Sequence, residues 1–222
     1  EFLAIVGASG CGKSTLLNIM CGMIEPSEGE VLIDGDSISS GKHRIGYISQ
    51  TDTLLPWRKI ESNVALGLEI EGISKKERLE QARKMIALSG MEGFEKKYPH
   101  ELSGGMRKRA VIIRALVQNP DIIFMDEPSG PLDVFTRETL QKEILKMWGE
   151  RKNTIIYITH DIAEAITLAD RIVLLSRRPS IVKNEYKVNL PRPRVIEECK
   201  YNPVFLELEK QIWHDIKDEL QE

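Results

Sequence analysis

The fold of this 222-residue chain is decided by one stretch near its start, Gly7-Ala8-Ser9-Gly10-Cys11-Gly12-Lys13-Ser14-Thr15. It fits the pattern G-x-x-x-x-G-K-[ST] and stands between an apolar run, residues 2–6, and a helical pattern that begins at Lys13. Glycines allow positive φ values, so the backbone can turn its N–H groups inward around phosphate oxygens. The stretch therefore predicts a strand, a phosphate-binding loop of all nine residues and a helix. Lys13 would contact the β- and γ-phosphates of a nucleotide, and Ser14 would bind Mg²⁺.

Strand and helix patterns alternate along most of the chain. Short apolar runs predict strands over residues 30–33, 44–48, 122–125, 154–158 and 171–175. The middle of the chain is helical instead: Ser74 and Glu77 form a capping box for one helix, and a second is predicted over 104–117. Alternation of this kind is typical of a parallel sheet covered by helices.

These patterns predict a single α/β domain spanning residues 1–222. Its mainly parallel sheet would form a catalytic core from residues 1–50 and 120–180. An α-helical subdomain, 51–119, would interrupt that core. A C-terminal extension, 181–222, would end in an amphipathic helix.

Composition and charge exclude several classes of protein. Lys and Arg number 31 against 34 Asp and Glu, a net charge of −3, so no basic surface argues for a nucleic-acid partner. No apolar run approaches the roughly 18 residues that a membrane span needs, and no leader pattern is present. We therefore expect a cytoplasmic protein that a partner can hold at a membrane. The three cysteines, too few for a disulfide framework, are expected to be reduced.

Two carboxylates follow the predicted strand 122–125. Asp126 would lie at the carboxyl end of that strand, where open α/β sheets bind ligands, and would hold Mg²⁺ through water. Glu127 is the candidate base or orienter for the attacking water. The alternative is a solvated acidic loop after a core strand.

Two further polar residues follow predicted strands. His160 could bond the γ-phosphate and position the water, although a lone histidine at a strand end is more often structural. Gln50 follows the strand over 44–48, and its amide could contact Mg²⁺ and the water. Alone, a glutamine in a loop is almost uninformative.

The chain resembles the ATP-binding-cassette (ABC) ATPases in the order and spacing of its motifs: the phosphate loop, Gln50, Leu102-Ser103-Gly104-Gly105-Met106, Asp126-Glu127, Leu132-Asp133 and Thr159-His160-Asp161. The resemblance covers essentially the whole chain. It implies a P-loop NTPase core of the RecA-like type, with ATP and Mg²⁺ as cofactors.

The same resemblance implies a role for each site residue. Glu127, His160, Gln50 and Lys13 would be catalytic, and Mg²⁺ would be held by Ser14, Gln50 and Asp126. The signature residues Ser103, Gly104 and Gly105 would bind the nucleotide of a second copy, in a head-to-tail homodimer that encloses two ATP molecules. Asp133 would be the D-loop aspartate.

Other stretches look similar to the importer branch for nitrate, sulfonates, taurine and related small solutes. They are Leu54–Arg58, Glu61–Glu69, Tyr98–Arg107 and Leu190–Arg194. This likeness implies a transmembrane permease as partner, indirectly a solute-binding protein, and a place on the inner face of the cell membrane. Leu55 and Trp57 form an apolar patch where a permease helix could dock; the alternative for Trp57 is packing within the helical subdomain. The cassette does not touch the solute, so the sequence does not name it.

Two rival functions remain open. One is a soluble ABC-type ATPase that acts on DNA or ribosomes without a permease, although such proteins usually need a long coiled coil or a second cassette. The other is a regulatory module that holds ATP without hydrolysing it.

The chain departs from the family pattern in three places. Lys108 stands where this branch usually has glutamine, and we expect it on a solvated face with a mild effect. Pro131 stands where alanine is usual in the D-loop, which puts cross-subunit contacts there in doubt. The family also has an adenine-stacking aromatic ahead of the first strand, whereas this sequence begins at Glu1. We therefore expect ATP to bind mainly through its phosphates, and a sheet edge to be exposed near Phe2 and Leu3.

Overall fold

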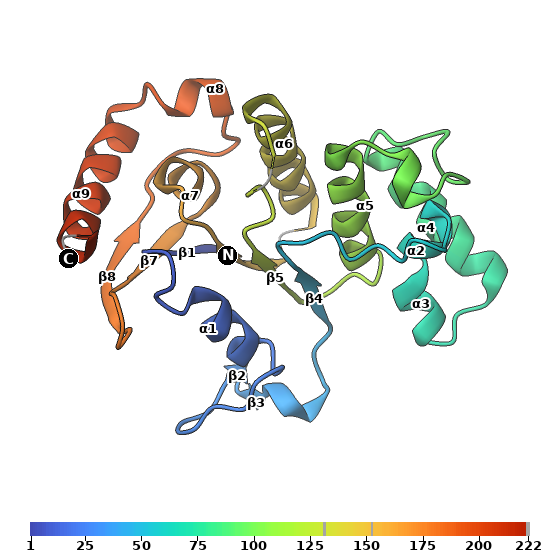
Figure 1. The fold of residues 1–222 in the computed structure, drawn as a ribbon, viewed down its shortest axis with the longest axis horizontal. Coiled ribbons are helices and arrows are strands. Elements are labelled where there is room, and N and C mark those ends of the chain that lie inside the picture. Colours follow the sequence, from blue (N-terminus) through green and yellow to red (C-terminus); the bar gives the residue numbers. More distant parts are fainter. Residues whose placement is uncertain (131, 152, 221–222) are drawn as a thin grey trace.

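The computed structural model describes residues 1–130, 132–151 and 153–220. Its centre is a six-stranded sheet in the order β4-β5-β6-β1-β7-β8, shown in Figure 1. The parallel strands are β4 (Ile45–Ile48), β5 (Ile122–Asp126), β6 (Thr154–Ile158), β1 (Phe2–Gly7) and β7 (Arg171–Leu175). The last strand, β8 (Val182–Lys187), pairs antiparallel with β7. The predicted α/β fold with a mainly parallel sheet is confirmed.

Helices cover both faces of this sheet. Figure 1 shows α1 (Lys13–Met20) on one face and α6 (Val134–Arg151) and α7 (Ile162–Leu168) on the other. Side chains of β5 alternate between the two layers, because successive residues of a strand point to opposite faces. Ile122 and Phe124 join the apolar cluster that contains Leu17 of α1, whereas Ile123 and Met125 join the larger cluster that includes α6.

The parallel strands bring separate parts of the sequence to one edge of the sheet. The carboxyl ends of β1, β4, β5 and β6 lead into the phosphate loop, Gln50, Glu127 and His160 respectively. Since parallel strands share a direction, these four segments meet at the same edge, where α/β sheets bind ligands.

The predicted helical subdomain lies at one end of the molecule, on the right of Figure 1. It contains α2 (Ile60–Val64), α3 (Leu66–Ile70), α4 (Lys75–Leu88) and α5 (Gly104–Leu116). Ser74 caps α4 by accepting a hydrogen bond from the Glu77 N–H at 3.4 Å, as the capping box predicts. Helix α5 packs on β4 and so joins the subdomain to the sheet.

The strand predicted over residues 30–33 is shorter in the structure and lies outside the six-stranded sheet. There, β2 (Leu32–Ile33) and β3 (Asp36–Ser37) form a separate antiparallel pair. Figure 1 shows this pair beyond α1, away from the six-stranded sheet.

The stretch predicted as a C-terminal extension begins with β8, which is an edge strand of the six-stranded sheet. After β8 come α8 (Ile196–Cys199) and α9 (Pro203–Leu220), the predicted amphipathic helix, which packs on α7. The connection is tied to the core by Arg194, which donates to the carbonyls of Ile166, Thr167 and Ala169 at 3.1, 3.0 and 2.7 Å. Burial lowers the pKa of Arg194 to about 10.

The expected exposed edge near Phe2 and Leu3 is wrong. Strand β1 is central, between β6 and β7, and Phe2 is fully buried. The edges of the sheet are β4 and β8 instead. Pro131, for which we expected an effect on cross-subunit contacts, lies outside the described residues. Within the described part of the chain, no helix combines the length and the apolar character that a bilayer crossing requires.

Candidate active site

The phosphate loop has the backbone shape that its glycines predict. Gly10 and Gly12 have φ values of +79° and +109°, a region that side chains other than glycine disfavour. Gly7 is needed for a different reason: a Cβ there would lie 2.9 Å from the buried Cys11 Sγ and 3.0 Å from the Leu175 carbonyl oxygen. The Cys11 side chain therefore packs beneath the loop, and the backbone of the loop is free to face a ligand.

Lys13 lies with its ammonium group against this loop. Its Nζ donates to the carbonyls of Gly7 and Ala8, each at 3.0 Å. The side chain is almost fully buried. A buried ammonium is stable only when its donors are satisfied, and here carbonyl oxygens satisfy two of them. The cation is thus held beside the loop whose N–H groups would contact phosphate.

Ser14 and Asp126 form the oxygen pair that the sequence predicts for a metal ion. Ser14 Oγ donates to Asp126 Oδ1 at 3.1 Å, although the two residues lie 112 positions apart. Burial raises the pKa of Asp126, the nearby Glu127 raises it further, and the Ser14 bond and Lys13 lower it. A hydroxyl and a carboxylate are the hard ligands that Mg²⁺ prefers, so the pair fits this ion. Among the described residues, no group of three or more His, Cys, Asp and Glu side chains could hold a metal alone. Phosphate and water oxygens would have to complete the coordination.

Gln50, Glu127 and His160 converge although they follow three different strands. His160 Nδ1 lies 3.1 Å from Glu127 Oε2, and Gln50 Nε2 donates to the same oxygen at 3.5 Å. The Glu127 side chain is one-fifth exposed and that of His160 is 60% exposed, so water can reach both. These three predicted residues therefore lie close enough to act on one water molecule.

The backbone at Glu127 is strained. Its φ is +42°, which is unusual for a residue with a side chain. Two hydrogen bonds hold it there: its N–H donates to the Ile158 carbonyl at 3.0 Å, and its carbonyl accepts from the Gly130 N–H at 3.1 Å. Such strain costs on the order of 1–3 kcal/mol and persists only when surrounding contacts fix it. The carboxylate is thereby aimed at Gln50 and His160.

Glu164 connects the loops that carry Glu127 and His160. Its backbone N–H donates to Asp161 Oδ1 at 3.0 Å, so Asp161 caps α7. The buried carboxylate also accepts four hydrogen bonds, from Ser129 Oγ (2.5 Å), Thr159 Oγ1 (2.6 Å), Tyr157 OH (2.8 Å) and Gln141 Nε2 (3.0 Å). Ser129 follows Glu127 by two residues and Thr159 precedes His160. One carboxylate thus holds both the loop after β5 and the loop after β6, and no sequence motif indicates this.

The signature residues lie apart from the phosphate loop of the same chain. Ser103 caps α5 by accepting from the Met106 N–H at 3.3 Å. Ser103, Gly104 and Gly105 line an open hollow of about 440 Å³ together with Asp133 and Thr136, and no residue of the phosphate loop contributes to its lining. Asp133 accepts from Thr136 Oγ1 at 2.6 Å, and this bond is the main reason that its pKa is lowered. Ser103, Gly104 and Gly105 therefore share one surface with Asp133.

Gly105 is required by close packing of α5 on α6. A Cβ there would lie 2.7 Å from Thr136 Cγ2. The threonine cannot turn away freely, because its hydroxyl is bonded to Asp133. We expect Gly105→Ala to lower the free energy of unfolding by about 1–3 kcal/mol. Thr136→Ser removes the methyl group but keeps the hydroxyl, so the double variant should recover most of the loss. Urea unfolding of the four proteins checks this, and a Gly105→Ala protein as stable as the wild type would contradict the packing.

Lys108 was expected on a solvated face, and this prediction is wrong. Its side chain is 1% exposed, and its Nζ donates to the carbonyls of Ser49 and Gln50 at 2.8 and 2.9 Å. Burial lowers its pKa, against the opposing effect of Asp52 and Asp126. The amphipathic pattern of α5 could not reveal this, because the chain that follows β4 covers the polar face of the helix.

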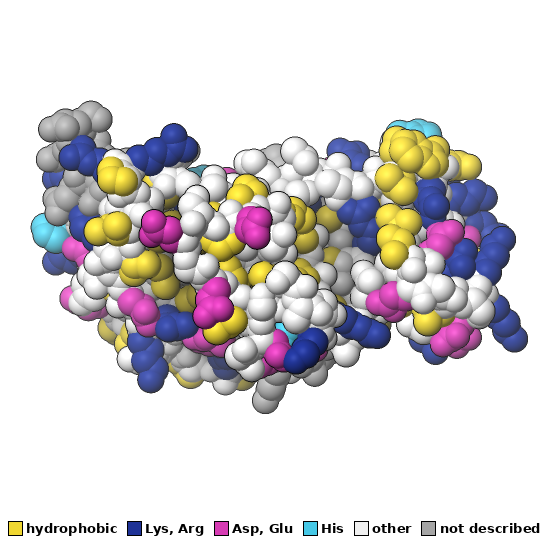
Figure 2. All heavy atoms as spheres, turned by 90° about the horizontal axis from the view of Figure 1, so that it is seen from below, with side chains coloured by type: hydrophobic (Ala, Val, Ile, Leu, Met, Phe, Trp, Pro, Cys, Tyr) yellow, Lys and Arg dark blue, Asp and Glu magenta, His cyan; other side chains and the backbone are white. Residues whose placement is uncertain are grey.

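Trp57 is exposed, so the alternative that it packs within the helical subdomain is wrong. It is 72% exposed and lines a hollow of about 290 Å³ on the helical subdomain, together with Arg58, Ser62 and Tyr98. Leu55 beside it is half-buried. Figure 2 shows hydrophobic side chains gathered at the helical end of the molecule, with Lys and Arg side chains around them.

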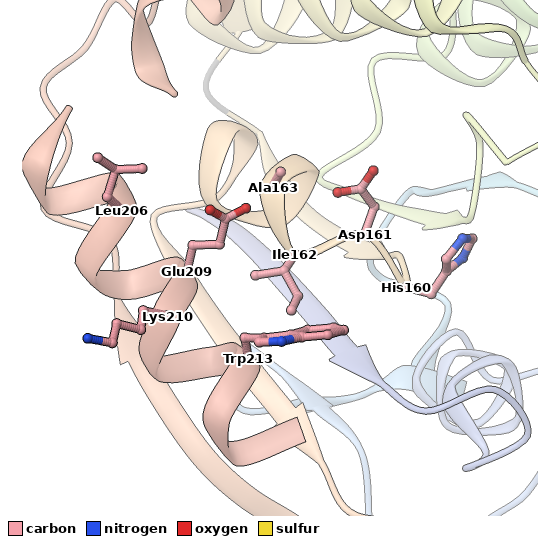
Figure 3. Close-up of a pocket in the computed structure, with 8 residues that line it drawn as sticks. All are labelled: His160, Asp161, Ile162, Ala163, Leu206, Glu209, Lys210 and Trp213. Carbon is pink, nitrogen blue, oxygen red and sulfur yellow. The ribbon is translucent and has the colours of Figure 1, made fainter. Parts of the chain in front are cut away.

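Another hollow lies on the other side of His160, between the start of α7 and helix α9, with a volume of about 660 Å³. Figure 3 shows Trp213 and Leu206 of α9 on one wall, Ile162 on the other and His160 at the rim. His160 alone among the predicted site residues contributes to its lining. The hollow is therefore adjacent to the site but not part of it.

The sequence is similar to those of known proteins over most of its length. A family model described as "ABC transporter" matches residues 1–130. An uncharacterized ABC transporter ATP-binding protein of Methanocaldococcus jannaschii is 46% identical over 99% of this chain and 81% of its own length. An aliphatic sulfonates import ATP-binding protein of Bacillus cereus is 41% identical, covering 96% of this chain and 82% of the relative. A taurine import ATP-binding protein of Escherichia coli is also 41% identical, over 96% and 85%.

Solved structures with the same fold include a dimeric ATP-binding cassette in a post-hydrolysis state, bound to ADP and Pi. It is 33% identical to this chain, has a TM-score of 0.74, and is matched over 86% of this chain and 87% of its own.

Proposed function

This chain belongs to the ABC transporter family, as one of its nucleotide-binding ATPases, and on that premise we propose that it powers the import of a small solute. The observation that carries the proposal is the convergence of Gln50 and His160 on one carboxylate oxygen of Glu127. A site built to hold a nucleotide without hydrolysing it has no need of such a group.

The site residues divide the reaction between them. The loop 7–15 would bind the phosphates, with Lys13 opposite the β- and γ-phosphates. Ser14, Asp126 and Gln50 would hold Mg²⁺, which neutralises charge on the phosphates when it is bound. Glu127 would accept a proton from the attacking water, and His160 would orient that water and donate to the γ-phosphate. Catalysis rests on positioning and charge more than on covalent chemistry.

A second copy of the chain would complete each site. The signature residues Ser103, Gly104 and Gly105 lie away from their own phosphate loop, and the start of α5 offers N–H groups to an anion. In a head-to-tail homodimer this helix start would contact the γ-phosphate held by the partner. The core of 1–50 and 120–180 would then carry one half of each ATP site, and the subdomain of 51–119 the other half.

The permease would dock beside Trp57. The loop that presents Trp57 is preformed, because the buried Asn63 side chain accepts from the Leu55 N–H at 2.7 Å and donates to the carbonyls of Leu55 and Arg58 at 3.0 and 2.9 Å. A large aromatic side chain held outward on a rigid loop suits a protein–protein contact. The protein would thereby lie on the cytoplasmic face of the cell membrane, with a solute-binding protein engaged through the permease. We propose a sulfonate, taurine or nitrate as the solute, and no nucleic-acid partner.

Hydrolysis measured with and without the permease tests this function. We expect Trp57→Ala to lower the ratio of permease-stimulated to unstimulated ATP hydrolysis by about tenfold, as for loss of an anchor worth about 1–2 kcal/mol. Leu88→Ala is the matched control, because Leu88 is 68% exposed on the same subdomain but lines a different hollow. Uptake of sulfonate, taurine and nitrate into vesicles with the complete transporter identifies the solute. Hydrolysis that no permease stimulates would favour a soluble ATPase, and no hydrolysis at all would favour a regulatory module.

A further inference from the structure

Lys108 is a buried cation that donates two hydrogen bonds to one loop of the site. The structure gives its Nζ two acceptors, the carbonyl oxygens of Ser49 and Gln50. Both belong to the segment that follows β4. A buried ammonium is costly unless it is well bonded, so this arrangement restricts where the segment can lie.

Two other cations of α5 hold the same segment. Arg107 Nε lies 3.1 Å from Asp52 Oδ2, and Arg114 donates to the Thr53 carbonyl at 2.6 Å and to the Thr53 hydroxyl. Together, Arg107, Lys108 and Arg114 contact four of the five residues from 49 to 53. We call these three side chains the α5 clamp.

The clamp connects two parts of the site that are far apart in sequence. The signature residue Ser103 caps the start of α5, and the segment that α5 holds includes Gln50. The Gln50 side chain in turn reaches Glu127 at 3.5 Å. A movement of α5 would therefore move the backbone from which this amide projects.

We propose that Lys108 is a positioning residue that fixes the Gln50 backbone, so that the Gln50 amide reaches Glu127 only while α5 holds the loop. This inference rests on the proposed roles of Gln50 and Glu127. It adds that α5, whose start is the signature segment, fixes the position of Gln50 in the same chain. Contact of Ser103 with a second copy would then change the distance between Gln50 and Glu127 of the same chain.

Lys108→Met tests the proposal, because it keeps the length and the burial of the side chain but removes the donor. We expect kcat for ATP hydrolysis to fall about tenfold, within the range of measured couplings between contacting residues, while the affinity for ATP stays within about twofold. Lys108→Gln retains an N–H donor and should recover most of kcat. Lys84→Met is the control, since Lys84 makes an exposed ion pair with Glu80 in the same subdomain.

A double-mutant cycle separates this role from a merely structural one. In a Gln50→Ala background the Lys108→Met change should have little further effect on kcat, because the side chain that it positions is gone. An equal fold-loss in both backgrounds would overturn the proposal, and so would a wild-type kcat in Lys108→Met. If Lys108→Met fails to fold, Arg114→Met serves in the same cycle. We expect it to lower kcat about threefold, again only when Gln50 is present. Failure of the proposed function is distinct, because it would appear as a wild-type kcat in Glu127→Gln.

Discussion

Glu127→Gln should retain ATP binding while hydrolysis falls by about 10²- to 10⁴-fold, the range that general acid–base catalysis contributes. The amide has the shape of the carboxylate but cannot accept a proton from the attacking water. The phosphate loop and the Ser14–Asp126 pair are unchanged, so ATP affinity should stay close to that of the wild type. Steady-state phosphate release and calorimetric titration of ATP measure the two effects separately.

The same variant should accumulate an ATP-bound dimer, because the step that consumes ATP is blocked. Size-exclusion chromatography with ATP and Mg²⁺ tests this. Glu207→Gln, an exposed change on α9 that removes the same charge, is the control and should hydrolyse ATP at the wild-type rate. Turnover by Glu127→Gln at the wild-type rate would remove Glu127 from the catalytic role.

The parts of this protein that could be predicted from sequence are those that depend on local pattern. The phosphate loop needs glycines at fixed offsets. A buried parallel strand such as β5 is a continuous apolar run that ends in Asp126, and Ser74 marks the start of α4. Residues that follow parallel strands meet at one edge of the sheet, so the sequence alone predicts that Gln50, Glu127 and His160 lie close together.

The parts that sequence missed depend on tertiary contacts. Lys108 is polar in an amphipathic helix, and only the chain packed over it makes it buried. Glu164 joins Tyr157 of β6, Gln141 of α6 and, from two loops, Ser129 and Thr159, so no spacing in sequence could reveal its network. Strand β8 shows no regular alternation of buried and exposed residues, since only Tyr186 is buried, and its place in the sheet comes from pairing with β7. The Gly105 requirement likewise follows from Thr136, which is remote in sequence.

Ser103→Arg should abolish hydrolysis without weakening the binding of ATP to the monomer. A bulky cation at the start of α5 would block the γ-phosphate held by the partner but would leave the phosphate loop of its own chain untouched. The change also removes a helix cap, which costs about 0.5–2 kcal/mol of stability. Ser74→Arg controls for that loss, because Ser74 caps α4 through a comparable bond to a backbone N–H. It should therefore reproduce the loss of stability but keep hydrolysis.

Mixing Ser103→Arg with Lys13→Ala tests whether the two halves of a site come from different chains. Each variant alone should be inactive, because every site in its homodimer lacks either Ser103 or Lys13. In a mixed head-to-tail dimer, one site pairs the intact Lys13 of one chain with the intact Ser103 of the other. Random mixing in equal amounts makes about half of the dimers mixed, with one complete site of two, so recovery should approach about a quarter of the wild-type rate if the sites act independently. Native mass spectrometry shows whether mixed dimers form. Ser103 lies apart from the phosphate loop of its own chain, so a shared site needs Ser103 from the partner. Mixed dimers that form but recover no activity would therefore contradict a shared site.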